Sequence, residues 1–148
     1  MTNKIINVLF VVICFTLLQS CTLSVSCLIY NNSGVDIIVT GFDVERMGES
    51  KVFRRALKPG KTVRIEKWDW HPISINKGGI VYKYDDRHGV PYEYTGFVGF
   101  GPFTKRQFKA QIEPNMKIYL IPINSSFPAS EFPAQPDGFP LCPTDFAC

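Results

Sequence analysis

The chain has 148 residues, which suits a single domain once any targeting segment is removed. Its formal charge of +3 is mild and its basic residues gather at most in adjacent pairs, so it lacks the basic face expected of a nucleic-acid-binding protein. Aromatic residues make up 14% of the chain and favour strands, while 11 glycines and 11 prolines predict many turns.

The N-terminus has the pattern of a targeting segment. Residues 1–4 carry one positive charge, and residues 5–18 form a nearly uninterrupted apolar run. A charged start, an apolar run of this length and small residues after it are typical of a secretory signal peptide. A retained membrane anchor is disfavoured, because a spanning helix needs about 20 apolar residues and this run ends at Gln19.

Residues 18–21, Leu-Gln-Ser-Cys, resemble the lipobox of bacterial lipoproteins, in which an aliphatic residue, a tolerant position and a small residue precede a cysteine. Gln19 departs from the small or aliphatic residue that is usual in that family. The resemblance implies removal of a signal peptide at residues 1–20, diacylglycerol on the Cys21 sulfur and an acylated amino terminus. Two or more acyl chains hold a protein on a bilayer where one does not.

The same resemblance implies a location. In bacterial lipoproteins an aspartate after the cysteine is associated with retention at the inner membrane, whereas this chain has Thr22. We therefore expect a protein that is anchored in the outer membrane and faces the periplasm. Secretion as a soluble protein stays open, because residues 24–26, Ser-Val-Ser, form a cleavage site of small residues before Cys27.

The cysteine count depends on that anchor. The sequence contains Cys14, Cys21, Cys27, Cys142 and Cys148. Removal of the leader and lipidation of Cys21 leave three cysteines, enough for one disulfide. We expect the pair Cys142–Cys148, because Cys27 falls on the inward side of an alternating strand, although a bond from Cys27 to either stays open. The cysteines lack a C-x-x-C spacing, so no metal site is expected.

After the leader, apolar and polar residues alternate with period two as far as residue 123. With turn signals every 8–12 residues, this pattern predicts an all-β domain at residues 21–123, a single antiparallel β-sandwich of about seven to eight short strands. Pro59 and Gly60 suit the centre of a type II turn and predict a hairpin over residues 51–67.

Aromatic residues mark two further segments of the predicted domain. The tyrosines of residues 80–84 share one strand face and those of residues 90–94 share another, which predicts cross-strand aromatic pairing. Residues 96–103, GFVGFGPF, predict a loop rich in glycine and phenylalanine.

From residue 124 onward the alternation is almost lost. Five prolines and four phenylalanines are spread through residues 124–148, a C-terminal extension rich in proline. A free tail would carry fewer aromatic residues, so we expect parts of the extension to pack on the domain. Residues 132–143, FPAQPDGFPLCP, are similar to the C-terminal tails of small bacterial envelope lipoproteins of unknown function.

The most unusual polar and aromatic cluster is Trp68, Trp70 and His71. Facing outward, the two indoles would stack on a sugar ring or clamp a partner's side chain. Facing inward, they would cap the core where a strand ends, which is the commoner arrangement in a single domain. The other histidine, His88, follows two aspartates in a segment that reads as a solvated turn.

The sequence shows no nucleophile elbow, zinc-protease motif or phosphate-binding loop, and we predict no enzymatic activity, cofactor or metal. The favoured function is a non-catalytic protein-interaction module, tethered to the membrane by its N-terminal lipid and meeting a protein partner in the envelope. The alternative is a glycan-binding envelope module that uses Trp68, Trp70 and the tyrosines. A hydrolase built on a histidine has the least support.

Overall fold

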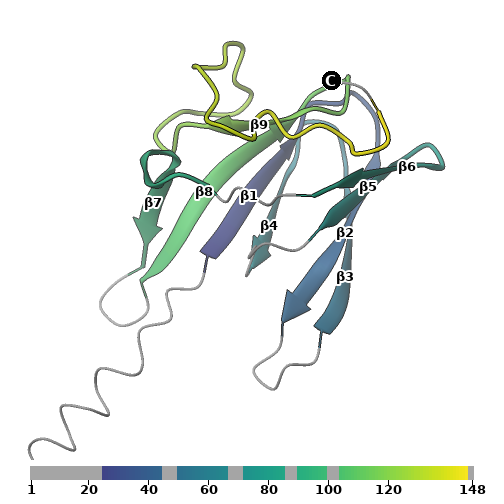
Figure 1. Ribbon diagram of the computed structural model, residues 1–148, viewed down its shortest axis with the longest axis horizontal. Coiled ribbons are helices and arrows are strands. Elements are labelled where there is room, and N and C mark those ends of the chain that lie inside the picture. Colours follow the sequence, from purple (N-terminus) through teal and green to yellow (C-terminus); the bar gives the residue numbers. More distant parts are fainter. Residues whose placement is uncertain (1–24, 45–49, 67–71, 86–89, 100–103, 147–148) are drawn as a thin grey trace, which may run out of the picture.

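The computed structural model describes residues 25–44, 50–66, 72–85, 90–99 and 104–146 (Figure 1). Over these residues the chain forms strands and one short 3₁₀ helix. Their bounds are β1 Val25–Asn31, β2 Ile37–Val44, β3 Ser50–Leu57, β4 Thr62–Glu66, β5 Ile73–Lys77, β6 Ile80–Tyr84, η1 Tyr92–Tyr94, β7 Thr95–Val98, β8 Lys105–Ile112 and β9 Ile118–Ile121.

The strands form two sheets that face each other as a sandwich (Figure 1). The first sheet has the order β4-β1-β8-β7, with β9 also paired to β8, and the second has the order β3-β2-β5-β6. Neighbouring strands are antiparallel except β1 and β8, which run parallel. The predicted all-β sandwich is therefore confirmed, with nine strands among the described residues.

The core lies between the sheets and follows the period-two pattern. Cys27 and Ile29 on β1 are fully buried, and they lie beside Phe108 and Ala110 of β8 in the parallel register. Val39 on β2 is buried opposite Ile75 of β5. Burying side chains of this size stabilises the fold by about 1.5–3 kcal/mol each, so the alternation in sequence selects which face of each strand turns inward.

The predicted hairpin over residues 51–67 is wrong in its pairing. The two strands and the turn are present, and Gly60 has the positive φ of +69° that this turn requires. However, β3 pairs with β2 in the second sheet, while β4 pairs with β1 in the first. The Pro59-Gly60 turn therefore carries the chain from the second sheet to the first.

The predictions for the aromatic segments also need correction. Residues 92–94 form a 3₁₀ turn closed by a bond of 3.1 Å from the Tyr94 amide to the Pro91 carbonyl, so they do not continue as a strand. Tyr94 is buried and Tyr92 is exposed, and β6 pairs with β5, so the two tyrosine pairs do not meet across a ladder. The predicted loop at residues 96–103 begins as β7, which pairs with β8.

Residues 127–135 of the C-terminal extension pack on the first sheet, and its last residues reach β6 of the second sheet; Figure 1 shows the extension as the yellow-green to yellow segment across the top of the molecule. Phe127 stacks on Tyr30 at 5.0 Å between ring centroids, and Phe132 stacks on Tyr119 at 4.1 Å. The two half-buried phenylalanine rings add apolar contact on the outer face of the first sheet, where the period-two pattern places more polar residues than on the core face. The expectation that parts of the extension pack on the domain is confirmed.

Glutamine side chains bind the extension to the sheet through main-chain groups. The Gln111 amide, fully buried on β8, accepts a bond of 2.9 Å from the Ala129 N–H and donates one of 2.9 Å to the Ala129 carbonyl. Gln135 of the extension makes the same two-bond contact with the main chain of Leu120 on β9, at 2.8 and 3.1 Å. Each amide therefore replaces a strand partner and satisfies polar groups that would otherwise be buried without one.

Candidate functional site

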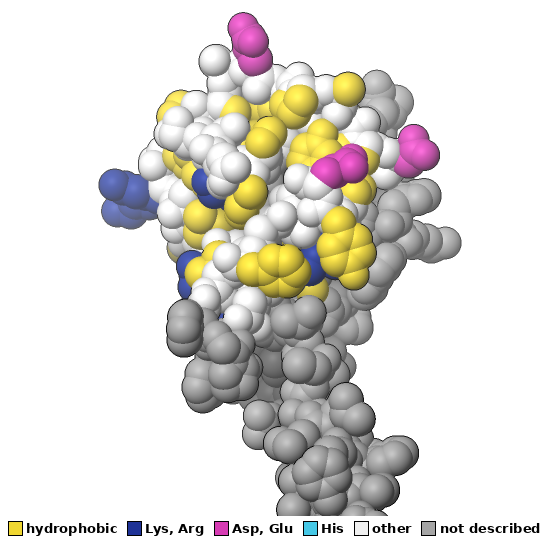
Figure 2. Space-filling view, turned by 90° about the vertical axis from the view of Figure 1, so that its left-hand side faces the viewer, with side chains coloured by type: hydrophobic (Ala, Val, Ile, Leu, Met, Phe, Trp, Pro, Cys, Tyr) yellow, Lys and Arg dark blue, Asp and Glu magenta, His cyan; other side chains and the backbone are white. Residues whose placement is uncertain are grey.

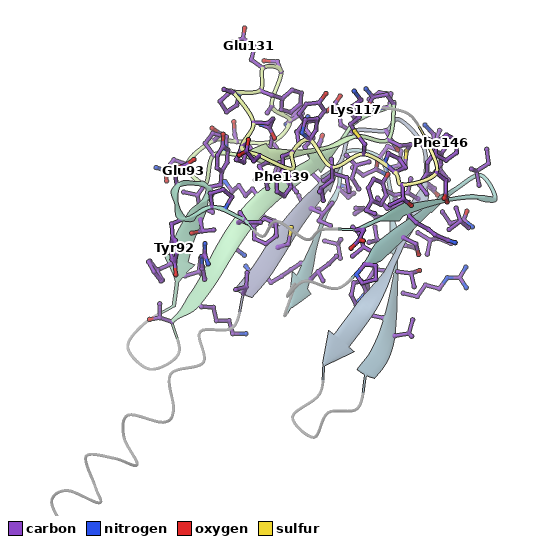
Figure 3. All side chains as sticks on the ribbon, viewed as in Figure 1. Tyr92, Glu93, Lys117, Glu131, Phe139 and Phe146 are labelled. Atoms are coloured by element: carbon purple, nitrogen blue, oxygen red, sulfur yellow. The ribbon has the colours of Figure 1, made fainter. Side chains whose placement is uncertain are left out.

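A pocket of about 280 Å³ lies at the end of the sandwich where β1 and β8 finish. Three segments that are distant in sequence enclose it: strand β6, the turn between β8 and β9, and the last part of the extension. Its lining residues are Tyr82, Pro114, Asn115, Met116, Lys117, Cys142, Pro143 and Phe146. Figure 3 shows Lys117 and Phe146 at this same end of the molecule.

Two aromatic rings form one wall of the pocket. Tyr82, half-buried on β6, packs against Phe146 of the extension with 4.9 Å between ring centroids and an angle of 31° between the planes. Phe146 remains 48% exposed. Nearby, the Thr144 amide donates a bond of 2.8 Å to the Lys83 carbonyl, which attaches the extension to the edge strand of the second sheet.

The opposite wall is the turn between β8 and β9. Met116 is buried with a φ of +65°, a conformation that a residue other than glycine rarely adopts. The Tyr84 hydroxyl donates a bond of 2.6 Å to the Met116 carbonyl, and the Lys77 ammonium donates one of 2.9 Å to the Pro114 carbonyl. These two bonds from the second sheet hold the turn of the first sheet in place.

Burial, and to a smaller extent the neighbouring Tyr82, raises the pKa of the Tyr84 hydroxyl above its ordinary range. The hydroxyl therefore stays protonated and remains a donor to the turn. Tyr84 is 1% exposed and does not line the pocket. Its contribution is structural, because its hydroxyl holds the Met116 turn that forms the wall.

The chemistry of the lining suits recognition of an apolar group. Lys117 supplies the one charge among the lining residues, and Asn115 supplies an amide. Within the part of the chain that the structure describes, no group of three or more histidine, cysteine, aspartate or glutamate side chains could hold a metal ion. No helix among the described residues has the length and apolar character needed to span a bilayer.

The sequence-predicted site residues fall in three places. Trp68, Trp70 and His71 lie outside the described residues, as do Cys21 and Cys148. Cys142 lines the pocket and is disulfide-bonded, while Cys27 is a buried thiol in the core. The disulfide of Cys142 therefore reaches a cysteine outside the described residues, and its assignment to Cys148 stays a prediction.

The tyrosines proposed for ligand contact are dispersed. Tyr82 lines the pocket, Tyr84 and Tyr94 are buried, and Tyr92 is exposed on the far side of β8 from β1. Sequence reasoning missed Met116 and Lys117 as site residues. Their only signal was the Pro114-Asn115 turn, and nothing local to that turn points to β6 or to Phe146.

Comparison with protein-family models, with curated proteins and with solved structures finds nothing that matches the chain.

Proposed function

We propose that the protein is a lipid-anchored module of the bacterial cell envelope that binds a protein partner and catalyses no reaction. The observation that supports this function best is the pocket between β6, the β8–β9 turn and the extension. Its volume of about 280 Å³ is at the lower limit for small-molecule sites, which span about 300–1,000 Å³. A pocket of this size suits a single anchoring side chain from a partner.

The lining indicates the chemistry of that side chain. The rings of Tyr82 and Phe146 offer apolar contact, and Lys117 offers a positive charge. An apolar or aromatic side chain next to a carboxylate would fill the pocket and pair with Lys117. A partner's anchoring residue with an acidic neighbour, or an apolar C-terminal residue with its own carboxylate, has this chemistry.

The position of the pocket agrees with a tether at the N-terminus. Strand β1 starts at Val25 and ends at Asn31, beside Ile112 of β8, from which the chain enters the pocket turn. The pocket therefore lies at the opposite end of β1 from Val25, which follows Cys21 by four positions in the sequence. A protein held at the outer membrane in this way would present the pocket to the periplasm.

A glycan-binding module is the second candidate. The ring pair of Tyr82 and Phe146 beside the Asn115 amide offers a stacking face and a hydrogen-bonding group, which sugars require. Trp68 and Trp70, the residues expected to stack on the sugar, lie outside the described ranges, so their part in this function stays a prediction.

The binding function is tested with purified chain immobilised and exposed to envelope extract. We expect a captured protein, identified by mass spectrometry and then purified, to bind the wild type at least about tenfold more tightly than Phe146→Ser. Phe97→Ser is the matched control, because Phe97 is also a surface phenylalanine, 65% exposed, but lies on β7. Equal affinity of wild type and Phe146→Ser would contradict a role for the pocket, and displacement of the partner by envelope glycans would favour the second candidate.

The anchor is tested by the intact mass of the mature protein from its native membrane. A chain that begins at Cys21 and carries diacylglycerol and acyl mass supports the lipoprotein assignment. A chain of unmodified mass, soluble without detergent, contradicts it. Alkylation of the same sample before and after reduction tests the predicted Cys142–Cys148 pair.

A further inference from the structure

Two exposed aromatic side chains and a half-buried arginine lie at the other end of the first sheet. In the register of the sheet, Val25 of β1 is beside Arg106 of β8, and Arg106 is opposite Phe97 of β7. Tyr92, just before β7, packs on Arg106 with its ring centroid 3.9 Å from the guanidinium carbon. We call Arg106, Phe97 and Tyr92 the aromatic–basic row; Val25, half-buried against the core, lies beside it on β1.

The two rings of the row are the most exposed large hydrophobic side chains among the described residues. Tyr92 is 77% exposed and Phe97 is 65% exposed. Both residues lie at one margin of the first sheet, because among the described strands β7 pairs with β8 alone and Tyr92 comes just before it. Exposed aromatic residues beside one another mark a surface that contacts another molecule or a membrane.

Arg106 holds the Tyr92 ring in position. Its guanidinium donates one bond of 3.0 Å to the Thr95 hydroxyl and one of 2.8 Å to the Val90 carbonyl, and it lies over the Tyr92 ring. Each of these contacts is with an uncharged group, so none of them neutralises the positive charge of the guanidinium. The row therefore combines two exposed aromatic rings with a cation, the combination that suits the headgroup region of a bilayer.

The charges around the row are consistent with an anionic surface. Lys105 is exposed next to Arg106 at the start of β8. Figure 2 shows hydrophobic side chains over much of this face, with basic ones among those in its lower half, whereas the acidic side chains lie in its upper half. In Figure 3 Glu93 lies farther than Tyr92 from the end at which β1 begins.

The row also lies next to the point where the proposed tether joins the domain. Three residues separate Cys21 from Val25, so an extended connection spans at most about 14 Å. Adjacent strands are about 4.8 Å apart, which places the Phe97 backbone about 10 Å from that of Val25 across β8. A lipid on Cys21 would therefore bring the row within reach of the bilayer surface.

We propose that the aromatic–basic row docks on the headgroup region of an anionic lipid bilayer and orients the domain with its pocket away from the membrane. A partner protein that adds a strand to β7 is the competing occupant. The four residues of β7 offer such a strand few main-chain bonds, and the closeness to the tether favours lipid. The orientation depends on the proposed lipid anchor, but contact between the row and lipid does not.

The test replaces residues 1–21 by a hexahistidine tag, which keeps every described strand and does not depend on lipidation. The tagged chain is bound to supported bilayers with a trace of nickel-chelating lipid, made either of phosphatidylcholine alone or of phosphatidylcholine with phosphatidylglycerol. We expect its residence time on the anionic bilayer to be about tenfold longer than that of the double variant Tyr92→Ser, Phe97→Ser, because the row adds a second attachment.

Two controls make the comparison specific. Ile80→Ser removes a side chain that is 54% exposed on β6, so it should leave the residence time unchanged. Thermal unfolding of the double variant should match the wild type, because both replaced rings are mostly in solvent.

The outcomes separate the row from the anchor. Equal residence times of the wild type and the double variant on the anionic bilayer would overturn the proposal, whatever the native mass of Cys21 shows. Equal residence of the wild type on the two bilayers would overturn the requirement for anionic lipid. Loss of a purified protein partner from the double variant in lipid-free solution, without any bilayer effect, would assign the row to that partner instead.

Discussion

The side-chain amide of Gln111 makes two hydrogen bonds to the main chain of the extension, and its removal tests how the extension is held. Replacing Gln111 by methionine keeps a similar side-chain volume but removes both bonds to Ala129 and the bond of 2.6 Å to the Glu113 carboxylate. Each such bond contributes about 1 kcal/mol net, and the main-chain groups of Ala129 lose their partner. We expect Gln111→Met to lower the free energy of unfolding by about 2–4 kcal/mol.

Gln107 provides a matched control on the same strand. It is also buried, but its side chain donates one bond to the Ser26 hydroxyl at 3.5 Å, the limit of a hydrogen bond. Gln107→Met should therefore cost less than about 1 kcal/mol. Urea unfolding of the three proteins, followed by circular dichroism, gives the two differences.

Hydrogen exchange adds a local measurement to the same comparison. Loss of the Gln111 amide should raise exchange in residues 127–135 of the extension before it affects β1 or β8. A cost below about 1 kcal/mol for Gln111→Met, or equal costs at the two glutamines, would refute the conclusion that side-chain amides replace strand pairing here.

Two further changes test the packing around the pocket and the extension. Tyr84→Phe removes the bond to the Met116 carbonyl and should cost about 1–2 kcal/mol in chemical unfolding at neutral pH. Because burial raises the pKa of Tyr84, the wild type should keep its stability up to about pH 10, where an unfolded tyrosine ionises, and lose it as the pH rises further. The decline should be shallower in Tyr84→Phe, and identical slopes would argue against this titration. Gly96→Ala would place a Cβ 2.8 Å from the Ile123 side chain and should lower the free energy of unfolding by about 1–3 kcal/mol. A double-mutant cycle with Ile123→Ala should show a coupling of about 1 kcal/mol. Simple additivity of the two changes would exclude the clash.

The period-two alternation predicted most of the strands and much of the core, but it missed β7 and the 3₁₀ turn at residues 92–94. Phe108, Ala110 and Ile112 are buried on β8 as that pattern requires. The alternation does not specify which strand lies beside which, because pairing depends on contacts between distant residues. The error over the 51–67 hairpin has this origin, since a good turn signal does not decide whether its two arms stay in one sheet.

The outer face of the first sheet shows a second limit of sequence reasoning. Gln111 reads as a solvent-facing residue between apolar neighbours, yet it is fully buried because the extension covers it. The aromatic residues of the extension indicated packing but not its location. The pocket was equally hidden, because Tyr82, Met116 and Phe146 meet only after both sheets and the extension have assembled.

The parallel pairing of β1 with β8 has a consequence for the order of assembly. The first strand of the domain lies in the interior of its sheet, and the Ser26 side chain meets Gln107, a residue 81 positions later in the chain. During synthesis β1 therefore cannot pair with β8 until most of the polypeptide has been made. Pairing between such distant strands slows folding. The chain therefore stays incompletely folded during synthesis for longer than a sheet of successive hairpins would.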